Sequence, residues 1–110
     1  MTGAGISTHV LDTTRGAPAA GVAVQLFRRD GRQLAEVGGG TTGEDGRIAN
    51  LLTAELAPGW YQLVFDLSTY YSSQQHFFTR VTLDLAISEA RHHHVPLLVS
   101  PYSCSSYRGS

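Results

Sequence analysis

Short segments of alternating apolar and polar residues, separated by Gly, Pro and Asp, constrain the fold of this chain most strongly. Alternation with a period of two places successive side chains on opposite faces of a strand, whereas an amphipathic helix needs a period of about 3.6. The clearest strand is Trp60–Leu67, with Tyr61, Leu63, Phe65 and Leu67 on one face. Further strands are expected at residues 6–11, 22–27, 33–42, 77–85 and 92–99. With the shorter segments between the other turns, such as Arg47-Ile48, the chain offers roughly seven or eight short strands. This number at regular spacing indicates an antiparallel sandwich or barrel.

Turn residues between these segments predict how the strands connect. Asp30-Gly31 lies between two predicted strands and is a strong hairpin signal. Asp45-Gly46 predicts a second tight turn. The polar segment 68–76 is the best place for a single short helix. Pro96 lies inside the last predicted strand and has no N–H for a ladder, so we expect an edge or a bulge there.

Length, charge and composition exclude several classes of protein. The 110 residues fit a single domain spanning residues 1–110. The net charge of −1 leaves no basic stripe of the kind that nucleic-acid binding needs. No apolar run reaches the roughly 20 residues of a membrane-spanning helix, and the N-terminus lacks the pattern of a secretory signal. The lone Cys104 excludes an internal disulfide, so we expect a cytoplasmic protein that binds neither nucleic acid nor membranes.

Histidines are the first candidates for chemistry, because most of them fall on predicted strands. Strand alternation places His92 and His94 on one face and His93 on the other. His9 points away from the face that its apolar neighbours would bury. His9, His92 and His94 could converge on a zinc ion, but further ligands at metal spacing are not evident. The alternative is that these histidines are ordinary polar residues on an exposed strand face.

Arg47 and the C-terminal segment are the remaining candidates. Arg47 follows a tight turn and could simply be a solvated cation at a strand edge. The final residues, Tyr107–Ser110, would ordinarily fray. The apolar segment 95–102 before them holds two prolines, so we expect it to pack and to hold the terminus in place. A Gly-x-Ser-x-Gly elbow, a Walker loop and a dinucleotide fingerprint are all missing, and we expect neither a cofactor nor a metal.

Three segments carry a more specific pattern: STHVLD at 7–12, TGEDGRI at 42–48, and HHHVPLLVSPY at 92–102 with YRGS at 107–110. Together they resemble the 5-hydroxyisourate hydrolases, the transthyretin-related enzymes of urate breakdown, over essentially the whole chain. The final Tyr-Arg-Gly-Ser is the most specific element, because it separates the hydrolases from the hormone-carrying transthyretins. The resemblance implies an all-β, transthyretin-like (prealbumin-like) two-sheet antiparallel β-sandwich with one short helix. It also implies a homotetramer with its sites at the interface between dimers.

The resemblance implies a set of site residues as well. Its catalytic residues correspond to His9, Arg47, His94 and Ser110. Its substrate-binding residues correspond to His9, Arg47, Tyr107, Arg108 and His92. Two positions depart from the family pattern: Cys104 stands where an aromatic residue is common, and His93 stands where Tyr is usual. The first departure bears on packing beside the tail more than on the chemistry, and the second is a mild change on the opposite strand face.

The implied reaction opens the six-membered ring of 5-hydroxyisourate at an amide-like C–N bond and yields 2-oxo-4-hydroxy-4-carboxy-5-ureidoimidazoline. A histidine, whose ordinary pKa is about 6.5, can take a proton from water and return it to the leaving nitrogen, a role open to His9 or His94. Arg47 suits a developing oxyanion, and the tail would fix the ring.

Two other classes of function stay open. One is a transthyretin-like carrier of an apolar ligand, although the polar residues named above disfavour an apolar channel. The other is a purely structural sandwich domain, for which the tail would be dispensable.

Overall fold

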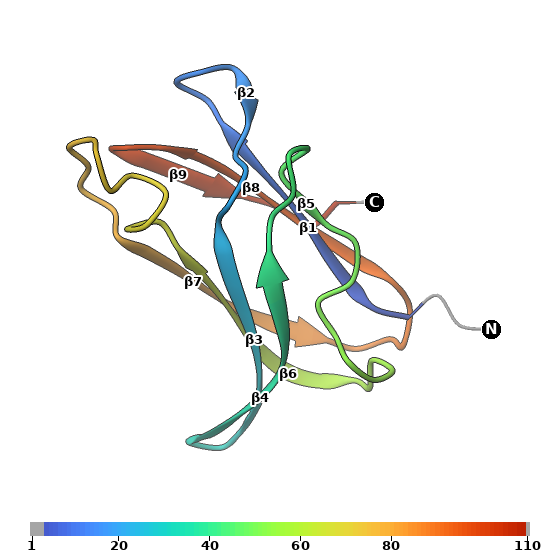
Figure 1. The fold of residues 1–110 in the computed structure, drawn as a ribbon. Helices are drawn as coiled ribbons and strands as arrows, with labels where there is room; N and C mark the ends of the chain where they lie inside the picture. Colours follow the sequence, from blue (N-terminus) through green and yellow to red (C-terminus); the bar gives the residue numbers. More distant parts are fainter. Residues whose placement is uncertain (1–3, 110) are drawn as a thin grey trace.

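Two sheets packed face to face form the molecule in the computed structural model, which describes residues 4–109 (Figure 1). The first sheet has the order β2-β1-β8-β9, with β5 paired to β1. Its strands are β1 (Ile6–Asp12), β2 (Ala17–Pro18), β5 (Arg47–Ile48), β8 (His93–Ser100) and β9 (Ser103–Ser106). The second sheet has the order β4-β3-β6-β7, with strands β3 (Ala23–Asp30), β4 (Gln33–Thr41), β6 (Gly59–Asp66) and β7 (Arg80–Ile87). The prediction of an all-β sandwich is confirmed.

The pairing of β1 with β8 is parallel, while the other strand pairs are antiparallel. The predicted antiparallel sandwich therefore contains this one parallel pair. The register runs without a break from Ile6 opposite His93 to Asp12 opposite Val99. Parallel neighbours need a long crossover, and here the whole second sheet supplies it. The first strand of the chain thus lies beside the C-terminal segment.

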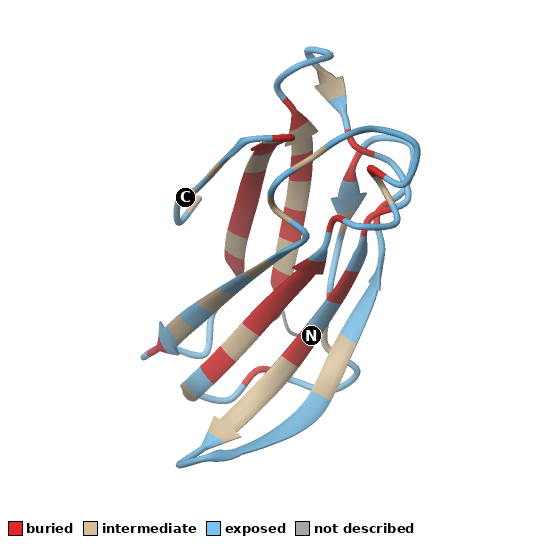
Figure 2. Cartoon of the chain, turned by 90° about the vertical axis from the view of Figure 1, so that its left-hand side faces the viewer, coloured by how far each residue is buried: buried red, intermediate tan, exposed pale blue. Residues whose placement is uncertain are grey.

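Burial alternates along β1 and β7 as the sequence pattern predicts (Figure 2). On β1, the side chains of Ile6, Thr8 and Val10 face inward, and His9 lies on the opposite face. The predicted apolar face of β6 is buried in full, and the core draws on both sheets. Its members include Ile6, Val10, Val24, Leu26, Tyr61, Leu63, Phe65, Leu67, Val95, Leu97 and Val99.

The predicted hairpin turn takes a defined form. The hairpin at Asp30-Gly31 joins β3 to β4, with Gly31 at a φ of 62°.

The edge or bulge predicted at Pro96 is wrong. Pro96 lies on β8, which is flanked by β1 and β9, and the registers of β8 with both neighbours are unbroken. The ladder to β9 begins only at Leu97, so the missing N–H of Pro96 costs no bond there. The Ser106 hydroxyl donates to the Pro96 carbonyl at 2.7 Å.

The short helix predicted for residues 68–76 is wrong, because this segment forms consecutive turns instead. A single helix-like bond runs from Tyr71 N–H to the Leu67 carbonyl (2.9 Å), and tighter turns follow it. Two neighbouring tyrosines in this segment make different tertiary contacts. Tyr71 is buried in the core, while the Tyr70 hydroxyl donates to the buried Asp12 carboxylate at 2.6 Å. Tertiary contacts of this kind outweigh the weak tendency of a short polar segment to form a helix.

Residues 4–109 contain no helix that is long and apolar enough to cross a membrane.

Gly38 on β4 provides a test of the packing between β4 and the loop that follows β5. A Cβ at Gly38 would lie 1.7 Å from the Leu51 carbonyl oxygen, so Gly38→Ala forces the two segments apart. We expect the free energy of unfolding to fall by about 1–3 kcal/mol, the usual cost of overpacking.

The matched control is Gly40→Ala on the same strand, whose Cβ would meet only the Ile48 side chain at 3.6 Å. Denaturant unfolding of both variants measures the difference. Equal stability of the two variants would show that the Gly38 contact is unimportant.

Candidate active site

A tight turn places Arg47 beside the first strand. Gly46 adopts a φ of 76°, and a Cβ there would lie 2.4 Å from the Val10 carbonyl oxygen, so only glycine fits. The Gly46 carbonyl accepts a bond from Val10 N–H (2.7 Å), and the Asp45 carboxylate accepts one from Arg47 N–H (3.0 Å). Arg47 then begins β5 directly opposite His9 on β1. The Asp-Gly pair in the sequence is therefore what delivers an exposed guanidinium to the side of His9.

The parallel register places two further histidines on the same outer face. Ser7 lies opposite His94, two residues before His9. The Ser7 hydroxyl oxygen is 2.8 Å from His94 Nδ1 and 2.8 Å from His92 Nε2. His92 precedes β8 and is exposed, whereas His94 is half-buried. The predicted common face of His92 and His94 is confirmed, although His92 itself lies just outside the strand.

These side chains surround a shallow depression of about 390 Å³ on the outer face of the first sheet. Its lining includes Ser7, Asp45, Arg47, His92 and His94. Histidine, arginine and hydroxyl groups thus meet in one place, although they come from three separate parts of the chain. Such a surface can bind a planar polar molecule and exchange protons with it.

Burial and neighbouring charge favour the neutral imidazole of His94. Burial lowers the pKa of His94 below its ordinary value, and the charge of Arg47 and the neighbouring imidazoles of His9 and His92 lower it further. Because a group with a lowered pKa loses its proton at a lower pH, His94 holds a free lone pair at neutral pH. A general base needs that lone pair.

The C-terminal tail returns to the site through Gly109. Gly109 N–H donates to the His94 carbonyl at 2.7 Å, and a Cβ at Gly109 would lie 2.8 Å from His94 Cδ2. The absence of a side chain therefore lets the backbone pass against the imidazole. The prediction that the tail packs in place is confirmed as far as Gly109, and Ser110 lies outside the described residues.

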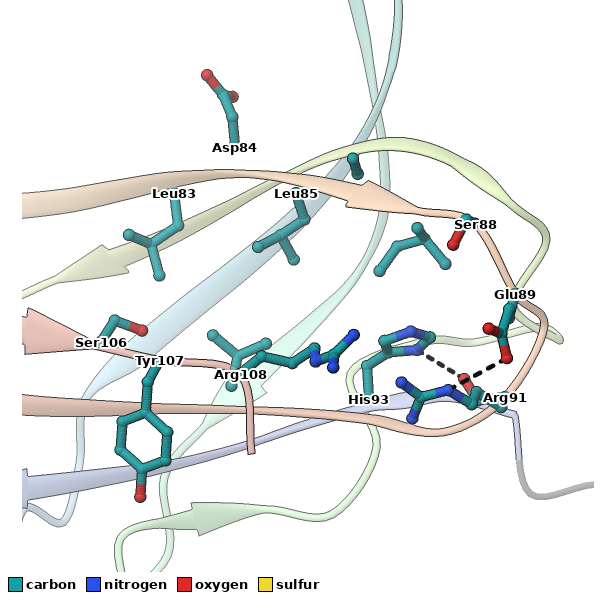
Figure 3. Close-up of a pocket in the computed structure, with 13 residues that line it drawn as sticks. Leu83, Asp84, Leu85, Ser88, Glu89, Arg91, His93, Ser106, Tyr107 and Arg108 are labelled. Carbon is teal, nitrogen blue, oxygen red and sulfur yellow. Dashed lines mark hydrogen bonds and ion pairs between the residues drawn. The ribbon is translucent and has the colours of Figure 1, made fainter. Parts of the chain in front are cut away.

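Arg108 and Tyr107 line a different cavity, of about 340 Å³, between β7 and the β8–β9 pair. Figure 3 shows Arg108 reaching along this cavity toward His93, while the Tyr107 ring points away from it. The predicted contact of Arg108 with substrate stays a prediction. In the single chain, Arg108 is exposed and lines this cavity, whereas His94 lines the depression on the outer face of the first sheet.

The sequence missed Ser7 as a site residue, although it stands two residues from His9 and strand alternation alone puts both on one face. The zinc alternative finds no ligand set in residues 4–109, where no group of three or more His, Cys, Asp or Glu side chains could hold a metal ion. Two of the three histidines of the zinc alternative, His92 and His94, instead share the Ser7 hydroxyl.

Comparison with known proteins identifies the family. The sequence model of the HIUase/Transthyretin family matches residues 6–109. The chain belongs to this family. Its transthyretin-like sandwich is similar to the structure of Klebsiella pneumoniae 5-hydroxyisourate hydrolase, with a TM-score of 0.86 and 35% identity over 96% of this chain and 99% of that one.

Other members of the HIUase/Transthyretin family are similar in sequence or in fold. The 5-hydroxyisourate hydrolase of Pseudomonas aeruginosa is 41% identical over 114 residues, which cover 96% of this chain and 90% of that protein. Sea bream transthyretin, solved in complex with thyroxine, gives a TM-score of 0.87 at 24% identity, over 94% of this chain and 93% of that one. The likeness to sea bream transthyretin concerns the fold alone.

The electrostatics of His94 can be tested by histidine NMR titration. We expect the wild-type pKa of His94 to lie below about 6.5, the ordinary value for histidine. Arg47→Gln should raise that pKa, because it removes a positive charge that disfavours the imidazolium. The pKa of His94 in Arg47→Gln should return only part of the way to the ordinary histidine value, since burial is the larger cause of the shift.

Arg80→Gln, an exposed arginine on β7 in the other sheet, serves as the control and should leave the His94 titration unchanged. An unchanged His94 pKa in Arg47→Gln would show that Arg47 does not act on this imidazole.

Proposed function

We propose that this chain hydrolyses 5-hydroxyisourate to 2-oxo-4-hydroxy-4-carboxy-5-ureidoimidazoline, a step of urate breakdown. The observation that carries this proposal is the meeting of a neutral imidazole, His94, with the fixed cation Arg47 and a second histidine, His9, on one sheet face. Several relatives that match nearly the whole chain bear the name 5-hydroxyisourate hydrolase, which supports the same assignment.

The reaction needs an activated water and a polarised carbonyl. We assign activation of the water to His94 and His9, with His94 as the base because its imidazole is held neutral. As the new C–O bond forms, the water proton passes to the base, and the carbonyl oxygen becomes an oxyanion. Arg47 stabilises that oxyanion, since its guanidinium keeps its charge. The proton then passes to the leaving nitrogen as the C–N bond breaks.

The tail completes the site in this proposal. Ser110 follows Gly109, whose backbone is bonded to His94, so the Ser110 hydroxyl is proposed as a group that orients the ring. Tyr107 and His92 are proposed to contact the substrate at the rim. Arg108, an exposed residue that lines the cavity beside β7 in the single chain, is proposed to bind the substrate as well.

Assembly would close a site that is open in the single chain. The depression lies on the outer face of the first sheet, and Leu11 and Leu98, which lie opposite each other on that face, are only half-buried. Covering this face with a second copy would exclude water and strengthen the electrostatic interactions inside. We therefore propose a homotetramer with sites at the interface between dimers. The cytoplasmic location stays a prediction from the sequence.

The enzymatic proposal is tested by generating 5-hydroxyisourate from urate with urate oxidase and following its decay. The wild type should accelerate the decay well beyond the spontaneous rate. His94→Ala, His9→Ala and Arg47→Ala should each lower kcat by about 100-fold or more, because each removes a base or an oxyanion donor.

The control for these variants is Gln25→Ala, an exposed residue on the outer face of the other sheet, which should keep full activity. A correctly folded wild type that leaves the spontaneous rate unchanged would refute the hydrolase proposal. Thyroxine binding by that inactive protein would favour a carrier instead.

The assembly proposal is tested by sedimentation velocity. The wild type should sediment as a tetramer, and Leu98→Asp should weaken assembly and activity together, because it places a charge on the face proposed to be covered. Gln25→Asp, on the outer face of the other sheet, should change neither. A wild type that is monomeric and fully active would contradict the proposed closure of the site.

A further inference from the structure

The bridge that Ser7 makes between two histidines is not used by the mechanism above. Its hydroxyl oxygen lies 2.8 Å from His94 Nδ1 and 2.8 Å from His92 Nε2. Both distances are those of good hydrogen bonds. Strand alternation points Ser7 toward the same face as His9, and the parallel register sets it opposite His94. The bridge thus joins the half-buried imidazole of the site to an exposed one.

The proton and lone pairs of a serine hydroxyl limit which atoms can donate and accept in this bridge. A serine hydroxyl has one proton and two lone pairs, so it can donate to only one of the two imidazoles. At least one of the two contacting nitrogens must therefore carry a proton and donate to Ser7. If His94 Nδ1 is the donor, the other ring nitrogen of His94, Nε2, is left with the lone pair that a base needs.

We propose that Ser7 is a positioning residue that relays a proton between His94 and His92, so that His94 changes between its two neutral forms during hydrolysis. This inference rests on the proposed function and assigns it a further residue. In the resting state His94 Nδ1–H donates to the Ser7 oxygen, and the Ser7 hydroxyl donates to His92 Nε2. His94 Nε2 is then free to accept a proton from water.

The relay balances through one complete turnover. When His94 Nε2 takes the water proton, the Nδ1 proton moves to Ser7 and the Ser7 proton moves to His92 Nε2. His94 is then neutral with its proton on Nε2, the serine hydroxyl is restored, and the positive charge stands on His92. When His94 Nε2–H is given to the leaving nitrogen, the proton on His92 returns through Ser7 to His94 Nδ1. The resting state is thereby regenerated.

The charges around His94 explain why a relay would help. Arg47 on β5, His9 on β1 and His92 before β8 all face His94 and oppose a positive charge on it, while Asp45 lines the same depression. His92 is exposed, so water can solvate the charge that the relay delivers there. Moving the proton outward thus avoids a half-buried imidazolium beside Arg47.

The first test is kinetic, with 5-hydroxyisourate generated from urate. Ser7→Ala should lower kcat by about 10- to 100-fold, within or just below the usual range for proton-transfer groups, with KM changed by less than about 3-fold. Ser7→Thr keeps the hydroxyl and should restore kcat to within about 3-fold of the wild type. Ser73→Ala, an exposed serine in the turns after β6, is the control and should keep full activity.

The double variant Ser7→Ala/His92→Ala separates a relay from two independent contacts. Members of one relay are not additive, so the double variant should be no slower than the slower single variant. Full kcat in Ser7→Ala, an equal loss in Ser7→Ala and Ser7→Thr, or additive losses in the double variant would each overturn the relay.

Nitrogen NMR of histidine provides a readout that does not depend on turnover. In the wild type near neutral pH, His94 should carry its proton on Nδ1, and Ser7→Ala should abolish this preference. A wild type with the proton on His94 Nε2 would overturn the proposed resting state. A wild type that fails to hydrolyse 5-hydroxyisourate would refute the proposed function, whereas an active wild type with an active Ser7→Ala would refute only the relay.

Discussion

The parallel pairing of β1 with β8 is the interaction on which the rest of the structure depends. It joins the two ends of the chain over seven successive residue pairs, from Ile6 with His93 to Asp12 with Val99. Its inward side chains, such as Val10 and Leu97, contribute to the core, while its outward side chains supply the site. One ladder therefore carries both stability and function. A slip by one residue would turn Ser7 and His9 into the core and expose the apolar set.

The site depends on a neutral base beside a permanent cation. Burial and neighbouring positive charges favour the uncharged imidazole of His94, while Arg47 stays charged in the same depression. This combination suits hydrolysis of a carbonyl compound and is unlike an apolar binding channel. The sandwich itself is shared with sea bream transthyretin, so the fold alone does not separate an enzyme from a carrier. The outward side chains of three strands carry that distinction.

The two departures from the family pattern lie away from this site. His93 faces the cavity between the sheets, where its Nδ1 lies 2.7 Å from the Arg91 carbonyl oxygen. Cys104 on β9 packs against the core, and burial raises the pKa of its thiol. Both side chains are on the inner side of the first sheet, opposite the face that holds His94. They therefore belong to the interior of the sandwich and not to its outward face.

The sequence by itself determined the all-β class, the inward face of β6, the hairpin at Asp30-Gly31 and the common face of His92 and His94, because period-two alternation and turn chemistry are local properties. The tertiary structure decided what depends on contacts between distant segments. Those are the parallel β1–β8 register, the turns in place of a helix after β6, the position of Arg108 at the cavity beside β7, and the bridge at Ser7. Alternation says which way a side chain points along one strand, but only the pairing of strands says which side chains it meets.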